Sequence, residues 1–275
     1  MDTEAYIISR FHSQHIGDDG AVIGEYVYSM DAFCEGTHFK RAWLTPKQIG
    51  RKAMLVNLSD AVAMNADPLY ALITLGVPDT MPKSEIDALS DALQTTAEAY
   101  GCEIIGGDTV KSDKLHIAIA LISRTEQPLL RTGLQAGDLL AFTGTLGESA
   151  RDLERLFRGE TIEEASRFVS PVLRNGFVRK ARPLLRAGMD ISDGLFCDTN
   201  KLLQANGTGC EILKNITDEE GLSGEEYEML VAFDPRNEAA VRAVAQDEGI
   251  PLTIFARVTN NDYRFPCKSH HFSEE

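Results

Sequence analysis

The sequence Met-Asp-Ile-Ser-Asp-Gly-Leu, residues 189–195, carries two carboxylates three positions apart at the junction of two predicted elements. Asp190 ends a short apolar strand, and Asp193 opens a helix that extends over residues 196–206 and stops at a glycine. Because a helix N-terminus attracts anions, two carboxylates there suggest that a cation joins them. Hard divalent cations prefer carboxylate oxygens, and Mg²⁺ commonly brings nucleotide phosphate with it. The alternative is one helix-capping Asp and one exposed Asp.

Further Asp residues stand beside glycine or serine in the rest of the chain. Asp18 and Asp19 pair at a glycine turn that leads into an apolar strand. Asp31 ends a β-rich run, Asp60 lies on a predicted helix, and Asp108 follows a predicted strand. Each is individually compatible with a turn, a cap or a solvated charge. Their shared placement favours a common role as ligands of a cation.

A length of 275 residues, with 43% hydrophobic and 25% charged residues, indicates a folded protein of one large or, more often, two ordinary domains. The polar, glycine-bearing stretch TGLQAGD (132–138) is interpreted as the joint between them. We therefore expect one domain at residues 1–134 and a second, α/β domain at residues 135–275.

The formal charge of −15 argues against nucleic acid and anionic membrane surfaces as main partners. Nucleotides would then bind through metal ions, in agreement with the many Asp residues. The five cysteines include no Cys-x-x-Cys pair, which is typical of reduced, cytosolic thiols. No run approaches the ~18 apolar residues of a membrane span, and the N-terminus lacks signal-peptide character. We therefore expect a cytoplasmic protein.

Hydrophobic periodicity predicts an α/β protein with layers of strands and amphipathic helices. Thr45-Pro46 is typical of an N-cap followed by proline at the first helical position, opening a helix that reaches about Met64. Further helices are expected at residues 4–12, 84–100, 148–157, 161–180 and 236–248. Strands are expected at residues 21–23, 26–33, 69–77, 103–105, 115–123, 139–143, 229–233 and 252–258.

Several common nucleotide-binding and catalytic motifs are missing from the sequence. There is no Gly-x-x-x-x-Gly-Lys-Ser/Thr P-loop and no Gly-x-Gly-x-x-Gly dinucleotide fingerprint. Protein-kinase signatures and a Gly-x-Ser-x-Gly nucleophile elbow are also missing. The six histidines show no zinc-ligand spacing with cysteine.

Seven stretches of the chain together carry a family resemblance. They are IGDDGAV (16–22), SMDAFCEGTHF (29–39), GRKAMLVNLSDAVAMNADP (50–68), EIIGGDTV (103–110), TGTLGESA (143–150), MDISDGL (189–195) and SGEEYEM (223–229). One such motif has little specificity, whereas seven in the same order are highly specific. In this order they resemble the thiamine-monophosphate kinase family, of the aminoimidazole-ribonucleotide-synthetase-like ATP-binding superfamily.

The resemblance implies a two-domain fold whose N-terminal domain binds ATP and Mg²⁺ and forms a homodimer. It also implies in-line transfer of the γ-phosphoryl group of ATP to thiamine monophosphate, giving thiamine diphosphate, with several Mg²⁺ ions as cofactors and no catalytic residue beyond their ligands. The implied Mg²⁺ ligands are Asp19, Ser29, Met30, Asp31, Asp60, Asp108, Asp190 and Asp193. The implied ATP-binding residues are Tyr100, Gly107, Asp108, Arg131 and Ser192, and the implied substrate-binding residues are His38 and Glu226.

The chemistry of such a transfer agrees with an acidic site. A phosphate monoester has its second pKa near ~6, so the acceptor is mostly dianionic at neutral pH and needs no strong general base. The obstacle is repulsion between two polyanions, which Mg²⁺ ions held by Asp side chains would remove. Arg131 can add a forked donor, and Gly106-Gly107 lets the backbone approach phosphate closely.

Two alternatives stay open at this point: another ATP-using enzyme of the superfamily, or a non-catalytic ATP- or Mg²⁺-binding protein. Selenophosphate synthetase would need a reactive cysteine in a flexible N-terminal segment, whereas the first cysteine here is Cys34. The hydrogenase-maturation dehydratase would need one at the extreme C-terminus, and Cys267 lies short of it. The six metal-type Asp residues argue against a non-catalytic protein. Met30 stands where the family commonly has Thr, and Glu226 stands where it usually has Asp.

Overall fold

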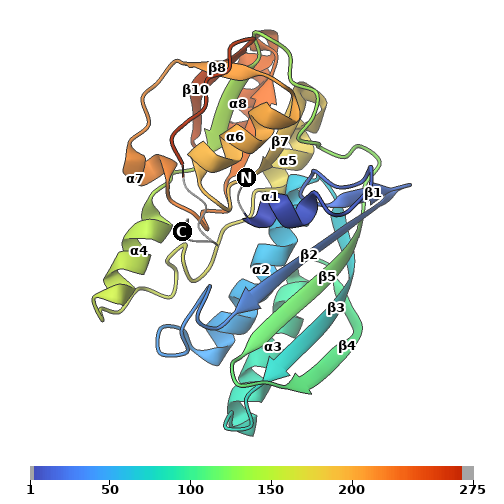
Figure 1. Ribbon diagram of the computed structural model, residues 1–275, viewed down its shortest axis with the longest axis vertical. Coiled ribbons are helices and arrows are strands. Elements are labelled where there is room, and N and C mark those ends of the chain that lie inside the picture. Colours follow the sequence, from blue (N-terminus) through green and yellow to red (C-terminus); the bar gives the residue numbers. More distant parts are fainter. Residues whose placement is uncertain (1–2, 268–275) are drawn as a thin grey trace.

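The computed structural model describes residues 3–267 and shows two five-stranded sheets, one from each half of the chain, with helices between and around them (Figure 1). The strand order is β1-β2-β5-β3-β4 in the first sheet and β7-β9-β6-β10-β8 in the second. The expected domain boundary after residue 134 falls between β5 and β6, where the chain passes from one sheet to the other. This mixture of helices and sheets confirms the predicted α/β class.

The first half contains α1 (Thr3–Ile8), β1 (Ala21–Ile23), β2 (Tyr26–Cys34), α2 (Pro46–Ala63), β3 (Asp67–Val77), α3 (Lys83–Ala99), β4 (Glu103–Lys111) and β5 (His116–Arg124). The second half contains β6 (Leu139–Thr143), α4 (Glu148–Phe157), α5 (Asn175–Ala181), β7 (Leu185–Asp190), α6 (Leu195–Ala205), β8 (Gly209–Ile212), α7 (Asp218–Gly221), β9 (Met229–Phe233), α8 (Glu238–Asp247) and β10 (Leu252–Thr259). Short 3₁₀ turns occupy Arg182–Leu184 and Pro235–Asn237. Over residues 3–267, no helix combines the length and the apolarity that crossing a bilayer requires.

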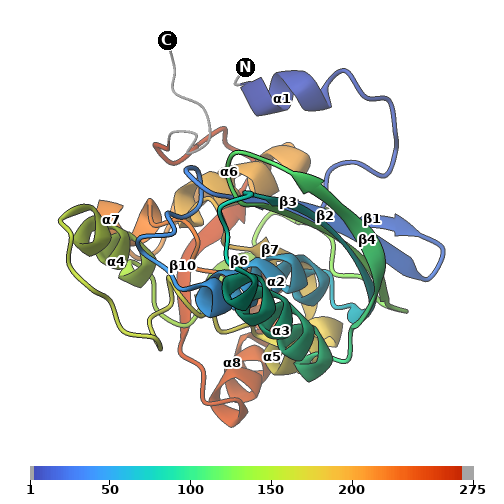
Figure 2. The same ribbon diagram turned by 90° about the horizontal axis from the view of Figure 1, so that it is seen from below.

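Helix α2 is the central element of the molecule. Thr45 begins it with a capping box, in which the Thr45 side chain accepts the N–H of Gln48 and the Gln48 side chain accepts the N–H of Thr45. Thirteen of its 18 residues are buried. With α3 it covers one face of the first sheet, and it also contacts β7 and α5 of the second half (Figures 1 and 2). Its buried polar residues, Lys52, Asn57 and Ser59, therefore lie between the two sheets.

The opposite face of the first sheet carries apolar side chains in exposed positions. Tyr28 and Tyr70 lie in one row across β2, β5 and β3, and Met30 and Leu72 lie in the next row. All four are at least 40% exposed. A continuous apolar surface of this kind is typical of a protein contact.

The second sheet is covered on both faces. Every residue of β6 and β9 is buried. Alternate residues of these two strands pack toward α5 and α8 on one side and toward α6 on the other. All pairings in this sheet are antiparallel. The acidic stretch follows the edge strand β7, whose residues are buried apart from the half-buried Arg186.

The helix expected at residues 161–180 is wrong for most of its length. Only Asn175–Ala181 are helical, and residues 158–174 form an irregular segment between α4 and α5. Pro171 has no N–H and restricts the residue before it, so a helix cannot run through this point without distortion. Arg167 and Phe168 in this segment are buried against other parts of the chain.

The strand expected at residues 103–105 is longer in the structure. Strand β4 continues to Lys111, so Asp108 lies within it instead of following it. Gly107 has a φ of 150°, and a Cβ at this position would collide with the Ile73 carbonyl of β3. Glycine at position 107 therefore allows β4 to continue beyond residue 105, where the expected strand ends.

Gly50 sets the spacing of α2 and α3, because a Cβ at this position would collide with the carbonyl oxygen of Leu89. Gly50→Ala is therefore expected to lower the free energy of unfolding by about 1–3 kcal/mol, despite the higher helix propensity of alanine. Urea unfolding followed by circular dichroism measures this change. Lys47→Ala, at an exposed position of the same helix, is the control and should change by less than about 0.5 kcal/mol. Unchanged stability in Gly50→Ala would contradict the close helix contact.

Candidate active site

A cavity of ≈1170 Å³ lies between the two halves of the chain. Its walls come from the loop before β1, from β2, α2 and the loop after β5, and from α4, the end of β7, α6 and the segment before β9. Nine of the predicted site residues line it: Asp19, Met30, Asp31, His38, Asp60, Arg131, Asp190, Ser192 and Asp193.

The first half presents Asp31 and Asp60 from neighbouring elements. Asp31 on β2 donates its backbone N–H to the side-chain oxygen of Asn57 on α2 at 3.0 Å. The Asn57 amide in turn donates to the carbonyl of Ala53 at 2.9 Å. This buried side chain fixes β2 against α2 where Asp31 and Asp60 face the cavity.

The second half presents Asp190 at the end of β7. Asp190 is only 3% exposed, and it accepts a 2.5 Å hydrogen bond from the hydroxyl of Ser59 on α2. This bond joins the two halves of the chain at the site. Sequence reasoning missed Ser59, although its place next to Asp60 in the same motif was the available signal.

Asp19 and Arg131 form an ion pair on the cavity wall. The Asp19 side chain is only 2% exposed, and burial raises the pKa of its carboxyl although Arg131 opposes that shift. Asp19 Oδ2 is buried and has no hydrogen-bond partner. A buried carboxylate oxygen without a partner is costly, and it is available to a cation.

Asp193 lies in a second ion pair, with Lys201 of α6. Lys201 is also 3.2 Å from Asp198, which accepts the N–H of Asp193 at 3.0 Å. Burial raises the pKa of the Asp198 carboxyl to about 7, although Lys201 favours its ionised form. Lys201 lines the cavity, and sequence reasoning missed it. The signal was its spacing of one helical turn from Asp198 in the helix that follows the acidic stretch.

The carboxylates at this end of the cavity repel one another. Burial, and then the charges of Asp31, Asp190 and Asp19, raise the pKa of the Asp60 carboxyl well above its usual value. Burial, and then the charge of Asp19, do the same to the pKa of Asp190. A divalent cation among these groups would stabilise their ionised forms.

The side chains at this site fit Mg²⁺ better than they fit a metal ion whose ligands are all protein groups. Among residues 3–267, no three acidic, histidine or cysteine side chains are close enough to hold a metal ion by themselves. Mg²⁺ usually takes one or two carboxylates and completes its shell with water and phosphate. Dispersed carboxylates and the unpartnered Asp19 oxygen are consistent with that arrangement.

The other end of the cavity is aromatic, with walls that include Phe33, Phe39, Trp43 and Phe168. Lys52 of α2 is fully buried there, with its ammonium 3.7 Å from the centroid of the Phe168 ring and 2.9 Å from the Glu225 carboxylate. Burial lowers the pKa of Lys52, whereas Glu225 raises it. His38 accepts the N–H of Cys34 through Nδ1 at 3.0 Å.

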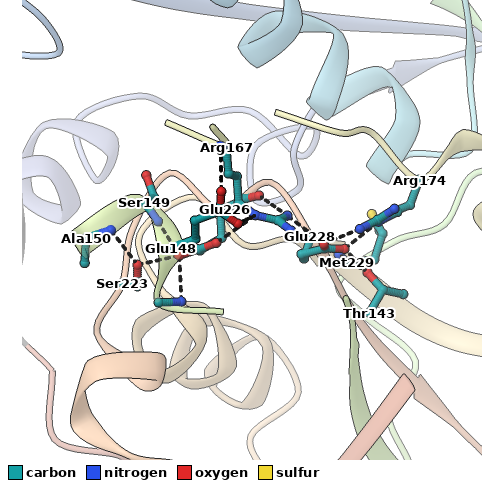
Figure 3. A network of polar contacts seen from close by, with 11 residues as sticks. Thr143, Glu148, Ser149, Ala150, Arg167, Arg174, Ser223, Glu226, Glu228 and Met229 are labelled. Carbon is teal, nitrogen blue, oxygen red and sulfur yellow. Dashed lines mark hydrogen bonds and ion pairs between the residues drawn. The ribbon is translucent and has the colours of Figure 1, made fainter. Parts of the chain in front are cut away.

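Glu226 does not line this cavity, although the resemblance implies a contact between its side chain and the substrate. Its side chain is fully buried, and Oε1 accepts the N–H groups of Gly147 and Ser149 and the hydroxyl of Ser223 (Figure 3). The carboxylate is thus occupied with the start of α4.

The placement of Glu226 follows from an alternation in the stretch Glu225–Glu228. Glu225 and Tyr227 line the cavity, whereas Glu226 and Glu228 are fully buried away from it. Glu225 is therefore the carboxylate of this motif that a ligand can reach. Sequence reasoning missed it, since the resemblance drew attention to the adjacent residue.

Besides Glu226, four predicted residues lie outside the cavity lining: Ser29, Tyr100, Gly107 and Asp108. Ser29 is buried within β2, and Tyr100 ends α3. Gly107 and Asp108 lie on the edge strand β4. The register pairs Asp108 with Thr74, on the exposed face of the first sheet. One copy of the chain does not bring these four residues to the site.

The sequence matches AIR synthase related protein, N-terminal domain, over residues 17–125 and AIR synthase related protein, C-terminal domain, over residues 135–266. The thiamine-monophosphate kinase of Aquifex aeolicus (strain VF5) is 36% identical over 218 residues, which cover 75% of this chain and 71% of that protein. The thiamine-monophosphate kinase of Leptospira interrogans is 34% identical over 227 residues, covering 74% and 73%. A solved structure of AaThiL complexed with AMPPCP and TMP matches with a TM-score of 0.83 and 29% identity, over 94% of this chain and 90% of that one. The chain therefore belongs to the thiamine-monophosphate kinase family, as the sequence motifs predict.

Proposed function

We propose that this protein transfers the γ-phosphoryl group of ATP to thiamine monophosphate, with thiamine diphosphate and ADP as products. The observation that carries the proposal is the two-ended cavity, with buried carboxylates at one end and aromatic rings around Glu225 at the other. Family membership supports it, since the solved relative is complexed with AMPPCP, an ATP analogue, and with TMP, which is thiamine monophosphate.

The carboxylate end suits the meeting of two phosphate groups. At neutral pH the acceptor phosphate is already mostly dianionic, because its second pKa is near ~6, so no side chain has to act as a strong base. When bound, Mg²⁺ would neutralise and align the phosphate oxygens. The residues that would hold it are Asp19, Asp31, Asp60, Asp190 and Asp193.

Arg131 and Lys201 supply positive charge at the same end. Each is paired with one of the ligand-type carboxylates, Arg131 with Asp19 and Lys201 with Asp193. A cation bound to these carboxylates would release both side chains toward phosphate oxygens, where the Arg131 guanidinium can donate two parallel hydrogen bonds. Their role is to bind and orient the phosphates.

The aromatic end suits the ring system of thiamine. The thiazolium ring carries a fixed positive charge, which aromatic faces and a nearby carboxylate both favour. Glu225 supplies that carboxylate, and Lys52 holds it in place at 2.9 Å. Phe168 supplies a ring face on the same wall.

We infer that two copies associate through the exposed face of the first sheet. Tyr28, Met30, Tyr70 and Leu72 form an apolar surface there of the kind that other proteins cover. Met30 belongs both to this face and to the cavity wall. A second sheet docked on this face would therefore bring its own exposed-face residues, Asp108 among them, next to the cavity.

We infer a cytoplasmic location from the cysteines. Cys34, Cys102 and Cys210 are free thiols, as is usual in a reducing compartment. Burial raises the pKa of the Cys102 and Cys210 thiols to about 11. These two cysteines are therefore unreactive structural residues at neutral pH.

The first test concerns the acceptor. In an ADP-release assay, thiamine monophosphate should be turned over, because its phosphate reaches the carboxylate end while its rings occupy the aromatic end. Free thiamine lacks the phosphate and should give no signal above background. Aminoimidazole ribonucleotide lacks the thiazolium ring and should likewise give none. Equal turnover of thiamine and thiamine monophosphate would rule out a phosphate acceptor.

The second test concerns the metal ligands. Asp190→Asn keeps the size of the side chain and the Ser59 hydrogen bond, and it should lower turnover by at least about 100-fold. Without metal it should unfold at higher urea concentration than the wild type, because an amide is less costly to bury among carboxylates than another carboxylate. Mg²⁺ titrations followed by thermal unfolding should show a smaller stabilisation in Asp190→Asn than in the wild type. A Mg²⁺ response identical to that of the wild type would remove Asp190 from the ligand set.

The third test concerns the dimer. Leu72→Glu places a charge in the exposed apolar face of the first sheet and should convert the dimer to a monomer in analytical ultracentrifugation. Ile212→Glu is the matched control, since Ile212 is also an aliphatic strand residue that is 40% exposed, on β8 of the second sheet. A monomeric wild type, or a Leu72→Glu variant that stays dimeric, would contradict the inferred contact.

A further inference from the structure

Two arginines and two glutamates of the second half form a network of ion pairs (Figure 3). Glu226 and Glu228 are fully buried, and Arg167 and Arg174 are at most 15% exposed. Arg174 donates to both oxygens of Glu228 at 2.5 and 2.6 Å, and Arg167 donates to Glu228 at 2.6 Å. Two positive and two negative charges thus balance in the interior, where an unpaired charge would be costly.

Glu226 connects this network to the start of α4. Its Oε1 lies 2.8 Å from the N–H of Gly147 and 3.1 Å from the N–H of Ser149, two groups that have no helical partner at a helix N-terminus. The hydroxyl of Ser223 donates to the same oxygen at 2.5 Å. Since Ser149 and Ala150 line the cavity, Glu226 fixes one part of its wall from behind.

Arg167 connects the network to a second part of the wall. Its Nε lies 3.2 Å from Glu226 Oε2, and its Nη1 donates to the Glu226 carbonyl at 3.2 Å. Its backbone N–H donates to Glu148 of α4 at 3.2 Å. The next residue in the chain, Phe168, turns into the cavity and lies over the ammonium of Lys52.

Glu226 and Arg167 are therefore each adjacent in sequence to residues of the cavity wall. Glu226 lies between Glu225 and Tyr227, and Arg167 precedes Phe168. We propose that Arg167, paired with Glu226, is a positioning residue for the acceptor, because it holds Phe168 and Glu225 where they contact the thiamine rings. This inference rests on the proposed function and adds a residue that touches no substrate atom.

Arg174 provides the control that distinguishes a positioning role of Arg167 from simple charge balance. It belongs to the same network and pairs with the same Glu228 carboxylate. It directly precedes α5, which packs against α8, and neither Arg174 nor α5 lines the cavity. Replacing Arg174 removes one buried cation and leaves the contact between Arg167 and Glu226 in place.

Arg167→Met and Arg174→Met are compared in steady-state kinetics with each substrate varied in turn. Arg167→Met should raise the KM for thiamine monophosphate about tenfold, the equivalent of one lost buried polar contact. Its KM for ATP should stay within about twofold of the wild type, since the carboxylate end is not part of the network. Arg174→Met should lower the melting temperature and leave both KM values unchanged. Arg167→Lys, which keeps the charge and loses the fork, should recover part of the lost affinity.

Equal KM shifts in the two methionine variants overturn the proposal, as does a shift for ATP as large as that for thiamine monophosphate. Glu226→Gln carries the same test where Arg167→Met does not fold, because the amide oxygen still accepts from Gly147 and Ser149. It should raise the same KM, and its effect should not add to that of Arg167→Lys. Additive effects would mean that Glu226 acts on the substrate independently of Arg167, and would also overturn the proposal.

Hydrogen exchange separates this inference from the proposed function, because it needs no substrate. The amides of residues 147–150 should exchange faster in Arg167→Met, or in Arg167→Lys where the methionine variant does not fold, than in the wild type and in Arg174→Met. Unchanged exchange at these amides overturns the positioning role. A wild-type protein that does not turn over thiamine monophosphate overturns the proposed function alone.

Discussion

The arrangement of the two sheets depends on the burial of helix α2. Its buried polar side chains form hydrogen bonds and an ion pair with both halves of the chain. Lys52 and Ser59 lie two turns apart on one side of the helix and reach Glu225 and Asp190 of the second half. Asn57 points the other way and accepts the Asp31 N–H of the first sheet. A buried polar group costs free energy unless it is paired. These three pairings therefore hold the two sheets in the one arrangement that forms the cavity.

The site that α2 assembles is itself unfavourable for the fold. Burial and mutual repulsion raise the pKa of Asp60 and Asp190, and Arg131 offsets only part of the cost at Asp19. The rigid surroundings make such a cluster tolerable, since β7 is enclosed on both faces and α2 is buried along most of its length. This is the usual relation between binding and stability: the groups that will hold a cation are kept together at the expense of the free energy of folding.

Elements and site residues that depend on local signals can be predicted from the sequence. Those that depend on contacts with distant residues cannot. The capping box at Thr45 and the Asp residues at element ends are local, so α2 and most cavity-lining carboxylates could be identified. The expected helix at residues 161–180 fails because Arg167 and Phe168 take partners about 60 and 116 positions away, in Glu226 and Lys52. The family motif marks the stretch Glu225–Glu228 but cannot tell which glutamate faces the cavity, because that depends on the backbone conformation.

That backbone conformation joins the two ends of the site. Glu225 and Tyr227 have φ values of 55° and 52°, a left-handed conformation that costs a non-glycine residue roughly 1–3 kcal/mol. Hydrogen bonds to the acidic stretch hold it: Glu225 donates its N–H to Ser192 at 2.7 Å, Tyr227 donates to Ile191 at 2.8 Å, and Ile191 donates to Glu228 at 2.8 Å. The residues that would hold the phosphates and the carboxylate that would meet the thiamine rings thus belong to one hydrogen-bonded ladder. The distance between the two ends of the acceptor site is therefore set by the backbone, and side-chain motion changes it little.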